Sequence, residues 1–564
     1  MKILSLHCDY IKFKPLKKAI KNPEELKSKE MVEVKEPLGI FTAVEKGDEV
    51  SLDRAVSELV KNVEDLVQKT KAKSIVLYPY AHLSSDLSAP DFAQNVLVEA
   101  EKQLKKKKFD VHRAPFGYYK EFELKCKGHP LSELSRSLVL GGEEKGEEYD
   151  AKKLLNQISK SKLDTSKLKP NDHRILGQRL DLFSFHDVAP GMVFFHNNGW
   201  IIWNELIKYW REVHRKAGYQ EIRTPEILDK KLWQISGHWE KYKENIFLTN
   251  YEGREFAVKP MNCPGGMLVW KNSPKSYKDL PLRVAELGTV HRQELSGVLG
   301  GMFRVVQFVQ DDAHIYCTEK QIEQEVLGIM DIVKEIYGKF GLSYRVELST
   351  RPEKRIGSDK IWDKAEKALE GVLKKKKIKY KINKGDGAFY GPKIDFHLKD
   401  SLGREWQTAT IQLDMAMPER FELEYTDRDN KKKRPIMLHR TVLGGIERFY
   451  AILLEHTNGN LPVWLSPVQV RVLSFTDKNQ KAAEKILEKL KSEGIRVDSD
   501  LRSTTVNEKV YDAEMMKIPY IIVMGDKEEG AGTVAVRKRG VKKIESVKLE
   551  GFVDGLKKEI ENRV

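Results

Sequence analysis

The sequence predicts a multidomain protein of mixed α/β and α+β class, and three observations support this prediction. Its 564 residues are enough for three or four domains of ordinary size. Strand-like and helical segments alternate near both ends of the chain, as in sheets covered by helices. A longer α+β stretch lies between them. We therefore expect domains at 1–140, 172–460 and 461–564, with a linker at 141–171 after the first.

The N-terminal segment begins with a strand-like run, MKILSLHCDYIKF, and has a second one in SIVLYPY. Between these runs, apolar residues recur at helical spacing from Ala55 to Val67. The acidic, glycine-bearing run GGEEKGEEYD then breaks the pattern and opens the linker, in which we expect a short helix at 151–160.

The C-terminal segment has the most regular pattern of the chain. VQVRVLSF, IRVDSD and IPYIIVM predict strands, separated by helices expected at 478–492 and 507–516. TVAVR and a helix from about 550 follow. Alternation of this kind predicts a mostly parallel sheet flanked by helices.

The composition narrows the class of protein. Hydrophobic residues make up 40% of the chain and charged residues 32%, which is typical of globular proteins. No apolar run approaches the roughly 20 residues of a membrane helix, and MKILSLHCDYIKFKP carries charges too early for a secretory signal. The four cysteines include no CxxC pair, so we expect no disulfide framework and a cytoplasmic location without a membrane partner. The net charge of +15 favours an anionic partner.

The most informative stretch runs from Arg283 to Cys317. It places Arg292 and Glu294 on one side of a glycine-bearing hairpin and Arg304 on the other. Two guanidinium groups aimed into one space suit a polyphosphate, because each can bind phosphate oxygens in bidentate fashion. A salt-bridged β-ribbon on a basic protein is the alternative interpretation.

Motifs within this stretch and elsewhere in the chain together resemble one protein family. HRQE, a glycine-rich turn, FR and QDDAHIYC resemble motif 2 of class II aminoacyl-tRNA synthetases, in the version carried by threonyl-tRNA synthetases. KPMNCPGGM, PIMLHRTVLGGIERF and GDKEEGAGTVAVRKRG resemble further segments of the same family, in the same order. The resemblance is to the archaeal type and covers nearly the whole chain apart from the linker. It implies a deacylase-like editing domain, a class II catalytic domain built on an antiparallel sheet, and an α/β anticodon-binding domain.

The resemblance implies a catalytic zinc ion, one per chain, held by Cys263, His314 and His439. Three protein ligands leave zinc an open position, which threonine can fill with its amino nitrogen and hydroxyl. Valine lacks the hydroxyl, and a hydrophobic pocket separates such isosteres by only ~10²-fold. As bare spacing, the three residues are weak support for a metal site. Gly266 stands where the family usually has histidine, a departure whose effect we expect to be local.

The resemblance also assigns residues to the substrates. The expected ATP-binding residues are Arg292, Glu294, Arg304, Lys393, Gln407 and Arg448, with Arg292 and Arg448 catalytic and Mg²⁺ accompanying ATP. The expected threonine-binding residues are Gln310, Asp312, Tyr390 and Gln412. Tyr390 and Gln412 could also be ordinary strand residues. His238, in SGHWEKY, resembles a histidine near the tRNA acceptor end and is a catalytic candidate for the transfer step.

A second active site is expected at the N-terminus. Serine lacks only one methyl group of threonine, which is worth about 1–3 kcal/mol, so the enzyme should hydrolyse mischarged Ser-tRNA(Thr). None of the 14 histidines has another four residues away, which excludes the HxxxH motif of the bacterial editing module. SIVLYPYAHLSSDLSAPDFA and APFGYYKEFELKCKGHPLSELSR instead resemble the archaeal editing domain, a relative of D-aminoacyl-tRNA deacylases. The candidate editing residues are His82, Tyr119, Lys120 and Glu133, with Lys120 catalytic; surface charges are the alternative for Lys120 and Glu133.

At the C-terminal end, Glu528 and Arg537 match positions that contact anticodon bases in the family, while Ser503 stands where asparagine is expected. YQEIRTPEILDKKLW resembles motif 1 and implies a homodimer. The expected activity is that of a threonine–tRNA ligase acting on L-threonine, ATP and tRNA(Thr), with no role for DNA. Two alternatives stay open. One is a paralogue that binds tRNA as a regulator without catalysis, and the other is an RNA-binding protein with a deacylase domain and no zinc.

Overall fold

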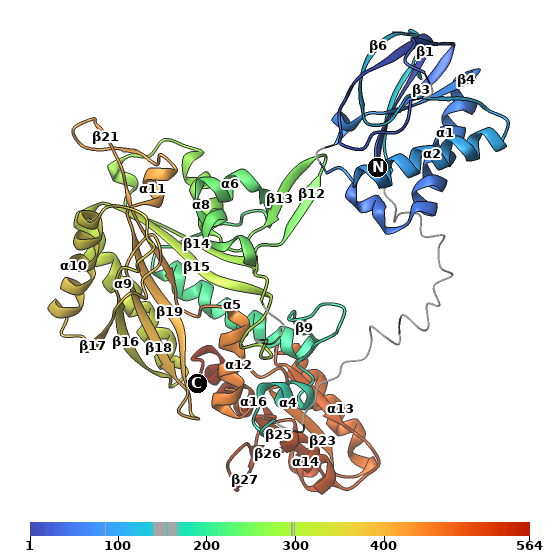
Figure 1. Ribbon diagram of the computed structural model, residues 1–564. Helices are drawn as coiled ribbons and strands as arrows, with labels where there is room; N and C mark the ends of the chain where they lie inside the picture. The colour runs from blue at the N-terminus through green and yellow to red at the C-terminus, as the bar shows by residue number, and fades with distance from the viewer. Residues whose placement is uncertain are drawn as a thin grey trace. The chain divides into compact units, whose positions relative to one another are not determined.

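The chain forms two compact units, Met1–Ala151 and Lys152–Val564 (Figure 1). The computed structural model describes residues 1–26, 28–84, 86–138, 155, 166, 168–294, 297 and 299–564, without the side chains of 241 and 242. Most of the predicted linker, including its expected helix at 151–160, lies outside these residues. Among the helices that are described, none combines the length and the apolar character needed to cross a membrane.

The first unit is a mixed sheet with two helices on one face (Figure 1). Its strands are β1 (Lys2–Lys18), β2 (Val32–Lys35), β3 (Pro37–Ala43), β4 (Ser74–Pro79), β5 (Asp110–Arg113), β6 (Tyr118–Cys126) and β7 (Glu133–Ser137). The order is β2-β1-β3-β4-β5, and β6 and β7 also pair with β1. The helices are α1 (Leu52–Thr70) and α2 (Pro90–Lys106).

The period of two along β4 explains why this sheet has two buried faces. Ile75 and Leu77 pack in the core under α1 and α2, whereas Val76 and Tyr78 point to the other face and pack with Phe41. That second face lies toward β6 and carries the cavity described below.

The second unit contains an eight-stranded sheet in the order β10-β14-β15-β22-β19-β18-β16-β17. These strands are β10 (Gln220–Glu221), β14 (Leu282–His291), β15 (Gln307–Cys317), β16 (Ser343–Ser349), β17 (Tyr380–Asn383), β18 (Lys393–Lys399), β19 (Glu405–Asp414) and β22 (Ile436–Thr441). All of its pairings are antiparallel except β10 with β14 and β16 with β17. The expected hairpin is present as β14 and β15, with His291 opposite Gln307.

Helices and small sheets complete this region. The helices are α4 (His173–Arg179), α5 (Asn197–Lys216), α6 (Lys230–Ile235), α7 (His238–Tyr242), α8 (Cys263–Lys271), α9 (Ile322–Lys339), α10 (Asp359–Lys375), α11 (Met417–Arg420) and α12 (Ile446–Thr457). The small sheets pair β11 (Ile227–Asp229) and β12 (Leu248–Tyr251) with β13 (Arg254–Val258), β8 (Phe183–Ser184) with β9 (Phe194–Phe195), and β20 (Tyr425–Thr426) with β21 (Lys432–Lys433). Apolar residues of α5, α9, α10 and α12 pack with the eight-stranded sheet in one large core.

The C-terminal region is a five-stranded sheet in the order β24-β23-β25-β26-β27. Its elements are β23 (Val470–Ser474), α13 (Gln480–Ser492), β24 (Val497–Asp500), α14 (Val506–Met515), β25 (Tyr520–Met524), α15 (Asp526–Ala531), β26 (Val534–Lys538), β27 (Ile544–Val547) and α16 (Leu549–Glu561). The mostly parallel sheet that we expected is wrong in part. Pairings of β23 with β24 and β25 are parallel, but those of β26 with β25 and β27 are antiparallel. The connections before and after β26 are too short for the crossover that parallel strands need.

Candidate active site

Two adjoining cavities lie along β15, β18, β19 and β22. The larger has a volume of about 520 Å³ and the smaller about 270 Å³. They share the residues Arg292, Gln310, Gln407, Thr410 and Thr441. The predicted residues that line only the larger one are Cys263, Asp312, Tyr390, Lys393, Gln412 and His439, and those that line only the smaller one are Glu294, Arg304 and Arg448. Segments nearly 200 residues apart in the chain therefore meet around one space.

Cys263, His314 and His439 form a cluster at the larger cavity. One potential ligand atom of each lies within 4.8 Å of the other two, and all three residues are buried. His314 and His439 are opposite each other in the β15–β22 register, and Cys263 is the first residue of α8. His439 Nε2 lies 2.8 Å from Asp414 Oδ2, which orients the ring and leaves Nδ1 for another partner.

The donor set of this cluster fits a zinc ion. His314 Nε2 is buried and has no hydrogen-bond partner among the described residues, so this nitrogen is available to a metal ion. One thiol and two imidazoles are zinc ligands, and three of them leave a position open. Gly266 lies closer to the cluster than the sequence indicates, because a Cβ there would be 3.6 Å from His314 Nδ1.

Three arginines give the smaller cavity its charge. Arg448 Nε donates to the carbonyl of Phe303 at 2.8 Å, and Arg304 forms an ion pair with Glu294 at 2.8 Å. Burial, with Arg304 and Arg292 nearby, lowers the pKa of Arg448. An anion bound among these guanidinium groups would offset their mutual repulsion, and phosphate suits guanidinium groups.

The residues of QDDAH alternate between two sides of β15. Gln310 and Asp312 line the larger cavity; Gln310 Oε1 is buried without a partner in the described part of the chain, and burial raises the pKa of Asp312 to about 6. Asp311 instead accepts from Arg440 Nη1 at 2.7 Å and from the amides of Val442 and Leu443. Gln310 and Asp312 can therefore bind a substrate in the cavity, while Asp311 links β15 to β22, the strand that carries His439.

One residue that the sequence did not single out organises the other side of the cavity. Asp395 is buried in β18 and accepts from Gln407 Nε2 at 2.6 Å, from Thr410 Oγ1 at 2.9 Å and from Ser349 Oγ at 2.7 Å. It also lies 3.0 Å from Lys393 Nζ. Burial alone would lower the pKa of Lys393, but Asp395 and Asp386 together raise it, so the ammonium form is held. The position of Asp395 two residues after Lys393 in KIDF was the available signal.

Tyr390 and Gln412 lie beside the metal cluster. The Tyr390 ring is 5.0 Å from the His439 ring, and Gln412 is opposite His439 in the β19–β22 register. His238 does not belong to the described lining of either cavity. It is fully buried, its Nε2 is 4.0 Å from Cys263 Sγ, and burial lowers its pKa to about 3. Its catalytic role stays a prediction that this burial disfavours.

A third cavity, of about 500 Å³, lies in the first unit. Its lining includes Tyr78, His82, Tyr119 and Lys120. Lys120 Nζ donates to the carbonyls of Pro115 and Tyr118 at 3.1 and 3.0 Å and lies 5.1 Å from the Tyr78 ring centroid. Burial lowers the pKa of Lys120 to about 8, partly opposed by the charge of Glu24.

Glu133 is not brought to this cavity. It is exposed on β7, opposite Leu6 of β1, and is not part of the described lining. Three of the four candidate editing residues therefore meet, and a role for Glu133 stays a prediction.

In the C-terminal region, Arg537 lies on β26 and Glu528 on α15, and both side chains are partly exposed. Among the residues that the structure describes, Arg537 makes one long ion pair, 3.7 Å, with Glu514, so its guanidinium can bind another group. Ser503 Oγ donates to Asp477 at 2.8 Å. The position that departs from the family pattern is thus engaged within the protein.

Comparisons with known proteins match all three regions. Residues 1–138 match the Archaea-specific editing domain of threonyl-tRNA synthetase, 242–457 match the class II core domain of the G, H, P, S and T synthetases, and 469–559 match an anticodon-binding domain.

Curated relatives named threonine–tRNA ligase extend this match. That of Carboxydothermus hydrogenoformans is 52% identical over 70% of the chain and 62% of its own length, and that of Caldanaerobacter subterraneus is 51% identical over 75% and 67%. The chain thus spans about three fifths of the first of these relatives. A crystal structure of the RNA-binding domain of threonyl-tRNA synthetase from Cryptosporidium parvum aligns with a TM-score of 0.67 at 40% identity, covering 69% of this chain and 98% of that one. The chain belongs to the threonyl-tRNA synthetase family.

Proposed function

We propose that the protein is a threonine–tRNA ligase that activates L-threonine with ATP, transfers it to tRNA(Thr), and hydrolyses mischarged Ser-tRNA(Thr) at its N-terminal domain. One observation carries the proposal. Cys263 and His439 of the metal cluster line the larger of two adjoining cavities, Arg304 and Arg448 line the smaller one, and Arg292 is among the five residues that the cavities share. An amino acid bound at one end and a triphosphate at the other would meet in the shared part.

The arginines suit the activation step. The threonine carboxylate attacks the α-phosphorus, threonyl-adenylate forms and pyrophosphate leaves. Arg292 lies in the shared part of the cavities and can contact both the carboxylate and the α-phosphate. Arg304 and Arg448 line the smaller cavity and can bind the leaving phosphates, which Mg²⁺ would bridge.

The threonine end suits recognition by coordination. A zinc ion held by Cys263, His314 and His439 would supply an open position for the amino nitrogen and hydroxyl of threonine. Gln310 and Asp312, which line the same cavity, would accept from or donate to these groups. Valine has no hydroxyl to bind, so the site would reject it more strongly than a shape-based pocket can.

The N-terminal cavity suits hydrolysis of an ester. Lys120 in its ammonium form can donate to the ester carbonyl, with His82 and Tyr119 lining the same cavity. The match of residues 1–138 to an editing domain supports this proposal. We also propose that the domains span 1–140, 172–460 and 461–564, and that Glu528 and Arg537 contact the anticodon of the tRNA. The proposal of a homodimer rests on the resemblance to motif 1 alone.

Two assays test the proposal. Threonine-dependent ATP–pyrophosphate exchange and charging of tRNA(Thr) are expected, with Ser-tRNA(Thr) hydrolysed when it is added preformed. A chain that binds tRNA(Thr) but supports no exchange would be the regulatory paralogue instead. A chain without bound zinc that deacylates but neither activates nor charges would be the RNA-binding deacylase.

A further inference from the structure

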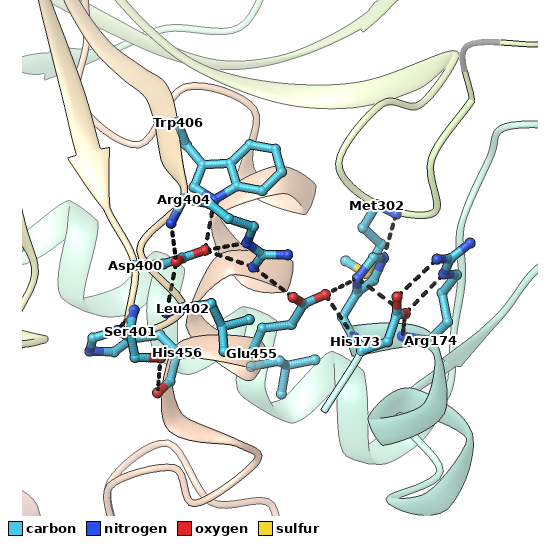
Figure 2. Close-up of polar contacts among 12 residues, drawn as sticks. His173, Arg174, Met302, Asp400, Ser401, Leu402, Arg404, Trp406, Glu455 and His456 are labelled. Atoms are coloured by element: carbon cyan, nitrogen blue, oxygen red, sulfur yellow. Dashed lines mark hydrogen bonds and ion pairs between the residues drawn. The ribbon is translucent and has the colours of Figure 1, made fainter. Parts of the chain in front are cut away.

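His173 is a buried histidine that no proposed step uses, and it lies at the start of α4 (Figure 2). Asp172, His173 and Glu455 resemble a metal cluster by distance alone. Both ring nitrogens of His173 are nevertheless engaged within the protein. Nδ1 is 2.6 Å from Glu455 Oε1, and Nε2 is 3.0 Å from the backbone nitrogen of Met302. A ligand role is therefore excluded by its hydrogen bonds.

The hydrogen bonds fix the ring in one tautomer. An amide N–H only donates, so Nε2 must accept from Met302 and the ring proton must sit on Nδ1, which donates to Glu455. Glu455 is itself held, because its other oxygen accepts from Arg404 Nη2 at 2.6 Å. Arg404 Nε in turn donates to Asp400 at 2.7 Å. Figure 2 shows this series of contacts from His173 to Asp400.

Met302, whose amide donates to His173, belongs to the loop between β14 and β15. This loop carries Arg304, a proposed phosphate-binding residue. Met302 is followed by Phe303, whose carbonyl accepts from Arg448, and then by Arg304 itself. The His173 and Phe303 rings are 4.5 Å apart at their centroids. Gly301 lies so close that a Cβ there would be 2.3 Å from His173 Nε2, and its φ of +57° favours glycine.

We propose that His173 is a positioning residue for ATP: through Met302 it holds the loop that places Arg304 and Arg448 at the smaller cavity. The inference rests on the proposed function of that cavity and adds to it. His173 contacts neither cavity, so it acts only through the loop. Loss of the bond should weaken ATP binding and leave threonine binding intact, because the metal cluster and the residues beside it come from α8, β15, β19 and β22.

Two substitutions separate the two bonds of the ring. In His173→Gln, the side-chain amide extends as far as Nε2 does in histidine, so its oxygen can still accept from the Met302 amide. In His173→Asn, the shorter side chain extends only as far as Nδ1, so it can donate to Glu455 but cannot accept from Met302. We expect His173→Asn to raise the Kd of ATP, measured by calorimetry without threonine, about tenfold or more. His173→Gln should restore most of the affinity, and the KM of threonine in pyrophosphate exchange should stay within about twofold of wild type in both.

His456, which follows Glu455 in α12, offers a matched control. Its Nδ1 also accepts a backbone amide, that of Ser401 at 3.1 Å, but this bond does not reach the β14–β15 loop. His456→Leu, which removes this acceptor, should leave ATP binding unchanged. Gly301→Ala is a second variant, because its methyl group would push the loop away from His173, and it should weaken ATP binding selectively as well.

The outcomes are distinguishable. Wild-type ATP affinity in His173→Asn or in Gly301→Ala would overturn the inference, as would equal losses of ATP and threonine binding. If His173→Asn does not fold, Gly301→Ala decides alone. A wild-type chain that binds ATP without threonine-dependent exchange would contradict the proposed function while the calorimetric comparison still tests His173. A wild-type chain that binds no ATP would overturn both.

Discussion

Arg448 illustrates, at the scale of single residues, how a binding site can be costly to the fold. Its guanidinium is buried near two other cations, and it donates a hydrogen bond to the carbonyl of Phe303. The three positive charges attract a bound anion, but in the free protein their mutual repulsion lowers the stability of the fold. Activity and stability should therefore respond in opposite directions when the charge is removed.

We expect Arg448→Met to lower kcat/KM for ATP in pyrophosphate exchange by about 10²–10³-fold, as for loss of a group that stabilises charge in a transition state. Its thermal midpoint should not fall, because the substitution relieves repulsion among the arginines. Calorimetric melting checks this. A drop of several degrees alongside the lost activity would show that Arg448 supports the fold, contrary to this account.

Lys120 gives a pH dependence at the N-terminal cavity. Burial lowers the pKa of Lys120 to about 8, so the ammonium form is lost as the pH rises through that value. If the ammonium donates to the ester carbonyl, hydrolysis of Ser-tRNA(Thr) relative to the spontaneous rate should decline between about pH 7 and 9. Lys120→Arg keeps its charge throughout this range, so any activity that it retains should lack the decline.

The measurement is the deacylation rate of Ser-tRNA(Thr) across that range, with and without protein. An enhancement that rises through pH 9 would mean that the neutral amine acts as a base instead. Lys120→Ala should abolish the enhancement of hydrolysis without changing threonine activation. The N-terminal cavity and the cavities proposed for activation lie in different compact units.

At the scale of elements, the pairing of β15 with β22 brings the two histidines of the metal cluster together. Asp311 and Arg440 secure this pairing with a fully buried ion pair at 2.7 Å. Asp311→Ala would leave the Arg440 charge buried without its carboxylate partner, which costs about 3–5 kcal/mol of unfolding free energy. Denaturant unfolding measures this loss.

A matched control is Glu319→Ala, which breaks an exposed ion pair with Lys364 at 2.7 Å. Exposed pairs contribute only about 0–1 kcal/mol. Equal effects of the two substitutions would contradict the structural role given to Asp311.

The elements also show what the sequence could predict. The β14–β15 hairpin, the helices α13 and α14 and the mixed α/β class are confirmed, because apolar periodicity and turn residues are local signals. The gathering of Cys263, His314 and His439 followed only from the family resemblance, since pairing between distant strands is not encoded locally. The antiparallel position of β26 was missed for the same reason.

Burial was the second limit. The sequence could not show that His238 is buried beside Cys263 or that Glu133 lies outside the described lining of the N-terminal cavity. β1 has register shifts where it pairs with β6, and such shifts change which side chains reach a face. His173 was overlooked because a single buried polar residue carries no spacing signal, and Asp395 was overlooked although it follows Lys393 by two residues.

At the scale of the whole molecule, the chain divides into two compact units with separate hydrophobic cores. We expect a fragment of residues 1–138 to fold and to hydrolyse Ser-tRNA(Thr), and a fragment of 168–564 to activate threonine without doing so. Circular dichroism and the two activity assays check this. A cooperative melt of the full chain together with two unfolded fragments would contradict the division.

The central claim is that threonine is selected by coordination to a metal ion at Cys263, His314 and His439. The most direct test measures metal content and threonine-over-valine discrimination in pyrophosphate exchange on the same preparation, before and after chelation. The account predicts one zinc ion per chain, loss of threonine activation on its removal, and recovery when zinc is restored. A metal-free chain that still prefers threonine to valine by a wide margin would contradict it.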